Sequence, residues 1–134
     1  MSSFKRIFAQ SKTLVGAALF AGLLTTASVA QADDAMAAKT IAGVLASLNH
    51  FPSADDKAAL AAIANDEDNG MAVRALANAV AEIQHSATAD GKAAMEKIVA
   101  SDMAGAQEKA LAEIVLGINH VPSAEAKASL QAML

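Results

Sequence analysis

The 134-residue chain contains no cysteine, no tryptophan and no tyrosine, and only 3% of its residues are aromatic. The lack of cysteine excludes disulfides, thiolate-bound metals, covalently attached c-type haem and lipid-modified cysteine. The shortage of aromatic rings disfavours modules that stack nucleic-acid bases. A formal net charge of −4 also argues against nucleic acid as a partner. The abundant class is apolar, at 54%, and much of it is alanine, which favours helices over strands.

Residues 1–32 have the pattern of a secretory signal peptide. Three basic residues stand near the start, residues 13–28 are mostly apolar and small, and Ala30-Gln31-Ala32 forms a small-x-small cleavage site. A transmembrane anchor is the competing interpretation, but no basic stop-transfer cluster follows the apolar run. We therefore expect cleavage after Ala32, export to a bacterial periplasm or to the medium, and no stable membrane insertion afterwards.

Removal of this segment would leave one domain, residues 33–134. It would hold 102 residues with 7 basic and 14 acidic side chains, a net charge of −7. Phe51 would be its only aromatic residue. Anionic lipid and nucleic acid would repel such a domain, so neither is an expected partner.

The remaining chain is a threefold repeat. Its three histidines, His50, His85 and His120, are 35 residues apart, within the related motifs Asn-His-Phe-Pro-Ser, Gln-His-Ser-Ala-Thr and Asn-His-Val-Pro-Ser. The same register aligns apolar positions before and after each histidine without gaps, which is a strong repeat signal. The repeats span approximately residues 33–65, 66–100 and 101–134.

Each repeat reads as two helices, because its apolar residues recur at helical spacing on both sides of the histidine motif. The Asn/Gln-His pair is expected to end the first helix, and Pro52 and Pro122 cannot continue it. Ser53, Thr88 and Ser123 are expected N-caps of the second helices, with a capping box through Asp56 in the first repeat only. We expect loops near 65–69 and 100–104, although Asp66 and Ser101 could instead be N-caps.

The predicted fold is therefore all-α, with six helices in three stacked hairpins. Such hairpins form a short right-handed α-solenoid or a compact helical bundle, because a single hairpin cannot bury its apolar face.

The middle repeat resembles the first helix of HEAT-type repeats. The likeness rests on the acidic turn Asp66-Glu67-Asp68, the pair Val73-Arg74 and the small and apolar positions that follow (Ala75, Ala79, Val80, Ile83). This resemblance implies an α-solenoid that binds other molecules through its concave face and has no catalytic residues.

The three histidines permit two interpretations. Imidazoles suit copper, zinc or nickel, and Met36 and Met71, also 35 residues apart, would add thioethers suited to Cu(I). In the structural interpretation each histidine closes a helix and bonds its last carbonyls. Stacked repeats would place the rings about 9–10 Å apart, too far for one ion to bridge. The structural interpretation is the one we favour from sequence.

Other features of the sequence point less directly to a function. Lys57, Lys92 and Lys127 recur in the first turn of the second helices, either covering the core with their stems or forming a basic stripe for a partner. The acidic turn 65–70 places Gly70 at the sixth position of a calcium loop but Leu76 at the twelfth, so it is not an EF-hand, although weak ion binding there stays open. No catalytic motif occurs, and an enzyme of unknown type is only a third hypothesis.

The sequence thus favours an exported, non-catalytic scaffold without a cofactor, binding a protein or peptide partner through its histidine loops. The alternative is a periplasmic copper- or zinc-binding protein that uses His50, His85, His120 and methionine.

Overall fold

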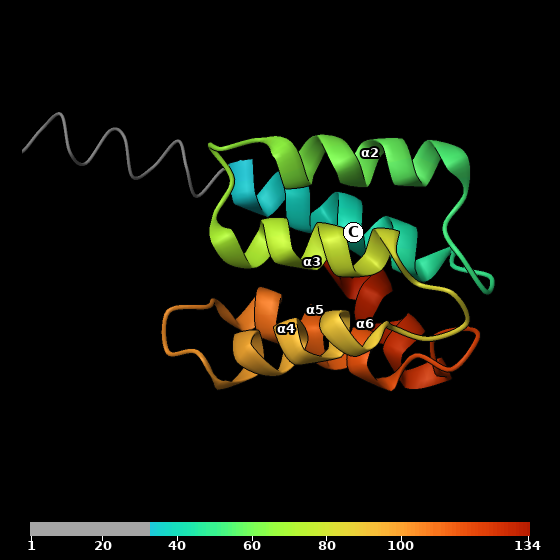
Figure 1. Ribbon diagram of the computed structural model, residues 1–134. Coiled ribbons are helices and arrows are strands. Elements are labelled where there is room, and N and C mark those ends of the chain that lie inside the picture. Colours follow the sequence, from blue (N-terminus) through green and yellow to red (C-terminus); the bar gives the residue numbers. More distant parts are fainter. Residues whose placement is uncertain (1–32) are drawn as a thin grey trace, which may run out of the picture. The chain divides into compact units, whose positions relative to one another are not determined.

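The computed structural model describes residues 33–134, which form one compact unit. The expected signal peptide and its cleavage site lie outside the described residues. The helices are, in chain order, residues 33–46, α2 (Ala54–Asn65), α3 (Met71–Ala81), α4 (Ala89–Ala100), α5 (Ala106–Gly117) and α6 (Ala124–Met133). The prediction of an all-α chain of three helical hairpins is confirmed (Figure 1). Among the described residues, no helix is long and apolar enough to span a membrane.

The second helix of each hairpin begins at a hydroxyl N-cap. Ser53, Thr88 and Ser123 have extended backbones, and each side chain accepts a hydrogen bond from the backbone N–H three residues later. Such a bond satisfies one of the N–H groups that a helix start leaves without a partner. Only Ser53 has the reciprocal bond, from its own N–H to Asp56 Oδ2 at 3.2 Å. The capping box predicted for the first repeat is therefore present.

The loops between hairpins differ slightly from expectation. They cover residues 66–70 and 101–105, one residue later than predicted, and Asp66 and Ser101 are C-caps rather than N-caps. The N-caps of α3 and α5 are Gly70 and Gly105, which have no side chain to cap a helix. At α3 the first repeat supplies the missing acceptor, since Asp34 Oδ1 accepts from the Gly70 N–H at 2.6 Å. Sequence reasoning could not see this bond because it joins two repeats.

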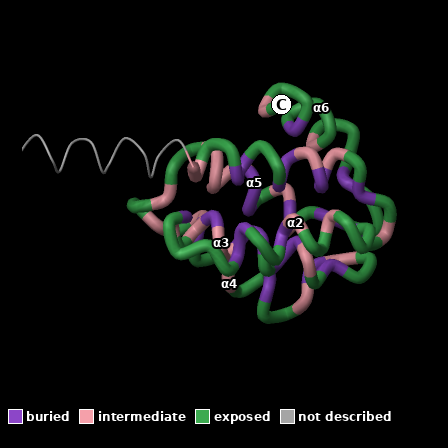
Figure 2. Tube along the Cα trace, turned by 90° about the horizontal axis from the view of Figure 1, so that it is seen from above, coloured by how far each residue is buried: buried purple, intermediate pink, exposed green. Residues whose placement is uncertain are grey.

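The core lies mainly on the first helix of each hairpin. The fully buried side chains there are Ile41 and Leu45, then Val73, Leu76 and Val80 in α3, and Leu111 and Val115 in α5. The second helices add fewer of them, one each from Leu60, Met95 and Leu130. Figure 2 shows the buried residues gathered on the inner side of the trace, with exposed residues outside. These positions are the apolar repeat positions of the sequence, as the helical periodicity implies.

The three hairpins close on one another. Helix α2 packs on α3 and α4 packs on α5, so each hairpin joins the next one along the chain, and α3 also contacts α5. The third repeat in turn reaches the first, because a β-carbon built at Gly43 would lie 3.8 Å from Leu134 Cδ2. Of the two arrangements expected, the compact bundle describes these contacts, since the end of an open stack would not touch its beginning.

Candidate functional site

The loop inside each hairpin makes a tight turn at its histidine. His50, His85 and His120 have φ values of 70°, 67° and 70°, and they are the only non-glycine residues with positive φ in residues 33–134. The Phe51 N–H donates to the Asn49 carbonyl at 2.9 Å, so His50 is the centre of a three-residue γ-turn. An L-residue with a β-carbon is strained in this region of backbone space, by roughly 1–2 kcal/mol. The chain therefore adopts a costly turn three times at the same residue type.

The three turns meet through their backbones. The His50 N–H donates to the His120 carbonyl at 2.9 Å, His85 donates to His50 at 2.8 Å, and His120 donates to His85 at 2.5 Å. Each histidine thus uses one N–H and one C=O in a closed cycle of three hydrogen bonds. We call these three residues the histidine triangle. The cycle places an approximate threefold axis at this end of the bundle, and Figure 1 shows the three hairpin loops on the same side.

The imidazole rings gather at the same point. Their centroids are 5.3 Å apart for His50 and His85, 5.4 Å for His50 and His120, and 5.0 Å for His85 and His120. The expected spacing of one repeat per ring is therefore wrong. It assumed hairpins stacked in a line, whereas closure of the bundle brings equivalent residues to a common axis.

The proposed helix-closing role of the histidines also needs correction. The first helices end at residues 46, 81 and 117, three to four residues before each histidine. Leu48, Ile83 and Ile118 occupy the intervening positions and are buried, so the chain leaves the helix to bury an apolar side chain before it turns. The hydrogen bonds that fix the three turns come from the histidine backbones, and the imidazoles are not needed for them.

Two of the rings have a side-chain partner. His50 Nδ1 lies 2.6 Å from Asn49 Oδ1, and His120 Nδ1 lies 2.7 Å from Asn119 Oδ1. An amide oxygen can only accept, so Nδ1 carries the proton in both rings. In the neutral imidazole this leaves a lone pair on Nε2. Sequence reasoning expected the Asn/Gln-His pair to end the first helix, and it did not foresee the contact of the asparagine side chain with the ring.

As the side chains stand, no group of three or more histidine, aspartate or glutamate residues within 33–134 is arranged to hold a metal ion. His85 and His120 are exposed and His50 is half-buried, so the rings are at the surface. Met36 and Met71 are 71% and 87% exposed, at the first turns of their helices. Those turns are at the opposite end of the bundle from the histidine loops, so the structure does not bring these thioethers to the triangle.

The remaining predicted residues surround the triangle or lie apart from it. Pro52 and Pro122 are buried just after the turns. Lys57, Lys92 and Lys127 follow the N-caps at the same end of the bundle, and their side chains are exposed. The acidic turn lies at the other end of the bundle from the histidine loops (Figure 1). Its Asp68 N–H donates to Asp66 Oδ1, and the buried Asn69 donates from Nδ2 to the Ile63 carbonyl at the end of α2.

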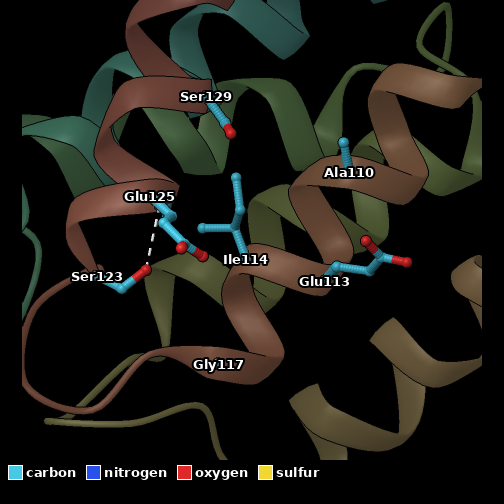
Figure 3. Close-up of a pocket in the computed structure, with 8 residues that line it drawn as sticks. Ala110, Glu113, Ile114, Gly117, Ser123, Glu125 and Ser129 are labelled. Atoms are coloured by element: carbon cyan, nitrogen blue, oxygen red, sulfur yellow. Dashed lines mark hydrogen bonds between the residues drawn. The ribbon is translucent and has the colours of Figure 1, made fainter.

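Two grooves lie between helices, and the larger one also has lining residues from the first and third repeats. The larger, about 750 Å³, runs along α4 in the middle hairpin. The smaller, about 280 Å³, lies between α5 and α6. Figure 3 shows Ile114 on its floor, the carboxylates of Glu113 and Glu125 nearby, and the 3.1 Å bond from the Ala126 N–H to Ser123 Oγ.

Comparisons of the chain with protein-family models, with curated proteins and with solved structures give no match.

Proposed function

We propose that the histidine triangle binds one divalent transition-metal ion, zinc or copper. The observation that carries this proposal is the separation of the three rings, 5.0–5.4 Å between centroids. A tetrahedral ion with metal–nitrogen bonds of about 2.0–2.1 Å holds the centroids of its imidazole ligands ~5 Å apart. The ring centroids therefore lie at a spacing compatible with shared ligation.

The ring partners support the same role. A histidine that binds a metal usually donates its other ring N–H to an oxygen, which fixes the tautomer and the orientation of the ring. Asn49 and Asn119 accept from Nδ1 in this way. The nitrogen left for the ion is Nε2, which in the neutral ring has its lone pair free.

Binding requires the rings to turn. The imidazoles of His50 and His85 stand edge to face at 86°, so their nitrogens do not yet converge. These side chains are not part of the buried core, and those of His85 and His120 are exposed. The backbone cycle can stay intact while the rings move, which limits the cost of reorganisation.

The occupied site would keep one position open to solvent. Three equivalent residues supply three ligands, and three neutral imidazoles leave the full double charge on the ion. In proteins this arrangement is typical of sites that hold a water or another exchangeable ligand at the fourth position. We therefore propose ion binding or buffering in the compartment to which the chain is exported, with no catalytic step assigned.

The test is calorimetric titration of Zn²⁺ and Cu²⁺ into the purified protein. We expect one ion per chain with a Kd below about 1 µM, a value that corresponds to roughly −8 kcal/mol. Changing any one histidine of the triangle to glutamine should weaken binding at least tenfold. Asn49→Ala should weaken it about tenfold, within the range for residues that hydrogen-bond to metal ligands.

The matched control is Lys57→Gln, which changes an exposed residue at the same end of the bundle and should leave Kd unchanged. Binding no tighter than about 1 µM, or binding kept by the variant with all three histidines changed, would exclude the proposal.

A second proposed function is the protein- or peptide-binding scaffold expected from the repeats. Its supporting observation is the 750 Å³ groove of the middle hairpin. A HEAT-type relationship belongs with this proposal. Arg74, of the Val-Arg pair on which that resemblance rests, donates from Nε to the Ala64 carbonyl at 3.0 Å and so connects α3 to the end of α2.

A further inference from the structure

The larger groove differs from the smaller one in its lining. Its walls come from the first turns of α3, one face of α4, the loop 101–105 and the start of α5. The floor is apolar and mostly small, with Val73, Ala75, Ala94 and Ile98. The groove of the third hairpin is less than half as large, and it is lined by two carboxylates and two serines besides Ile114. Of these two grooves, the larger one also has the more apolar lining.

Two methionines flank the apolar floor. Met71, at the start of α3, is 87% exposed, and Met103, in the loop before α5, is 96% exposed. They are the two most exposed large apolar side chains in residues 33–134. Methionine is flexible and polarizable, and it adapts to varied partner side chains on binding surfaces. Both methionines line the groove, so they can close over an occupant.

The rim of the groove is acidic. Asp34, Asp90 and Glu108 contribute three carboxylates, against the single ammonium of Lys97. Residues 33–134 as a whole carry 14 acidic and 7 basic side chains, so the field around the groove is negative as well. Charge complementarity therefore selects a cationic partner, and the apolar floor selects one with an apolar face.

We propose that this groove binds a basic amphipathic peptide helix. Such a helix would place its apolar side chains on the alanine-lined floor between the two methionines, and its lysine or arginine side chains against the three carboxylates. This mode, in which one helical face fills a groove, is a general form of peptide recognition. The inference rests on the protein-binding proposal, and it adds the chemistry of the partner.

The test uses a fluorescein-labelled 18-residue peptide of leucine and lysine at helical spacing, titrated with the purified protein and followed by anisotropy. We expect saturable binding of one peptide per chain that weakens as salt is added, because the rim charges become screened. A second peptide, with glutamate in place of each lysine, should bind at least tenfold more weakly.

Two matched variants locate the site. Ala93→Phe fills the groove from an exposed position on α4, and it should weaken binding of the leucine–lysine peptide at least tenfold. Ala58→Phe makes the same change at the equivalent exposed position of α2, which lines neither groove, and it should have no effect. Circular dichroism should show both variants folded. An Ala93→Phe variant that has lost its helical signal is replaced by Met71→Gln with Met36→Gln as its control.

The outcomes separate the two proposals. Equal binding of the acidic peptide would overturn the inference about charge and leave the protein-binding proposal standing. Equal loss in the groove variant and its control would place binding elsewhere and overturn the inference. No binding of either peptide would overturn both the inference and the assignment of this groove to protein binding.

Discussion

The backbone N–H of His50 lies 2.9 Å from the carbonyl oxygen of His120, although these residues belong to the first and third repeats. This bond closes the cycle that passes through His85, so we expect the three repeats to unfold as one cooperative unit rather than as a row of neighbours. An open row of repeats melts approximately as a sum of local terms. A closed cycle couples the two ends of the chain of repeats, so a destabilising substitution in the third repeat should also destabilise the first.

Leu130 provides the test of that coupling. It is completely buried and contributes the only fully buried side chain of α6, so Leu130→Ala should lower the free energy of unfolding by about 2–5 kcal/mol. Urea denaturation measures this loss, and hydrogen exchange should show faster exchange in helix 33–46 as well as in α6. The control is Gln131→Ala at an exposed position of the same helix. Unchanged protection of helix 33–46 would argue against closure.

Two substitutions at His50 can separate the contribution of its backbone conformation from that of its imidazole ring. Glycine adopts positive φ without a steric penalty, so His50→Gly should be more stable than His50→Ala by about 1 kcal/mol. Both variants lose the imidazole, and both should lose metal binding to the same extent. Thermal denaturation and zinc titration of the two variants measure these effects. Equal stability of the two variants would show that the φ of 70° is not retained in solution.

The bond from Asp34 to Gly70 should matter more than an ordinary surface contact. Asp34→Ala removes the acceptor of the α3 N-cap N–H, and hydrogen bonds to charged groups contribute about 1.5–3 kcal/mol. We expect a loss of that size in urea denaturation. Asp33→Ala, at the preceding residue, is the control and should change stability by less than about 0.5 kcal/mol. A loss at Asp33 equal to that at Asp34 would contradict the assigned contact.

The hydroxyl caps should differ in strength. Ser53→Ala and Ser123→Ala should each cost about 1 kcal/mol, as is usual for N-caps. The loss should be larger at Ser53, because Asp56 then also loses its bond from the Ser53 hydroxyl at 2.7 Å. Ser129→Ala, in the exposed part of α6, should have little effect. Thermal melts of the three variants rank these losses, and the reverse order at Ser53 and Ser123 would contradict the capping box.

Ion binding should appear as added stability. A ligand that binds only the folded state stabilises it by about 2.7 kcal/mol when its free concentration is 100 times its Kd. We therefore expect zinc to raise the melting temperature of the wild-type protein and not that of a variant with glutamine at 50, 85 and 120. The melts are recorded with and without a chelator, and an equal rise in the variant would place the ion elsewhere.

Local features of the fold were predictable from single repeats. The spacing of Val73, Leu76 and Val80 predicts a helix with one buried face. Ser53, followed by Asp56 three residues later, predicts the N-cap of α2. These features depend on neighbours in the chain, so a local pattern contains them. The loop boundaries moved by one residue because Gly70 and Gly105 begin their helices without a side-chain cap.

The arrangement of the repeats was harder to predict, because closure depends on contacts between residues far apart in sequence. The same histidine spacing fits rings in a line and rings around an axis. The three histidine motifs contain one sign that the repeats do not form an open array. The first and third copies both have Asn-His followed by an apolar residue, proline and serine, whereas the middle copy diverges. In an open array the terminal repeats are usually the atypical ones, since they cap the core with a polar face.

The cycle of three backbone bonds also bears on how many repeats can share the axis. Every histidine N–H in the cycle donates to a histidine carbonyl, and each of these carbonyls accepts from one histidine N–H. A fourth copy could join the cycle only by breaking one of these bonds, and a wider cycle would separate the rings. We therefore expect duplication of one repeat to lower the stability of the bundle rather than to lengthen it without cost.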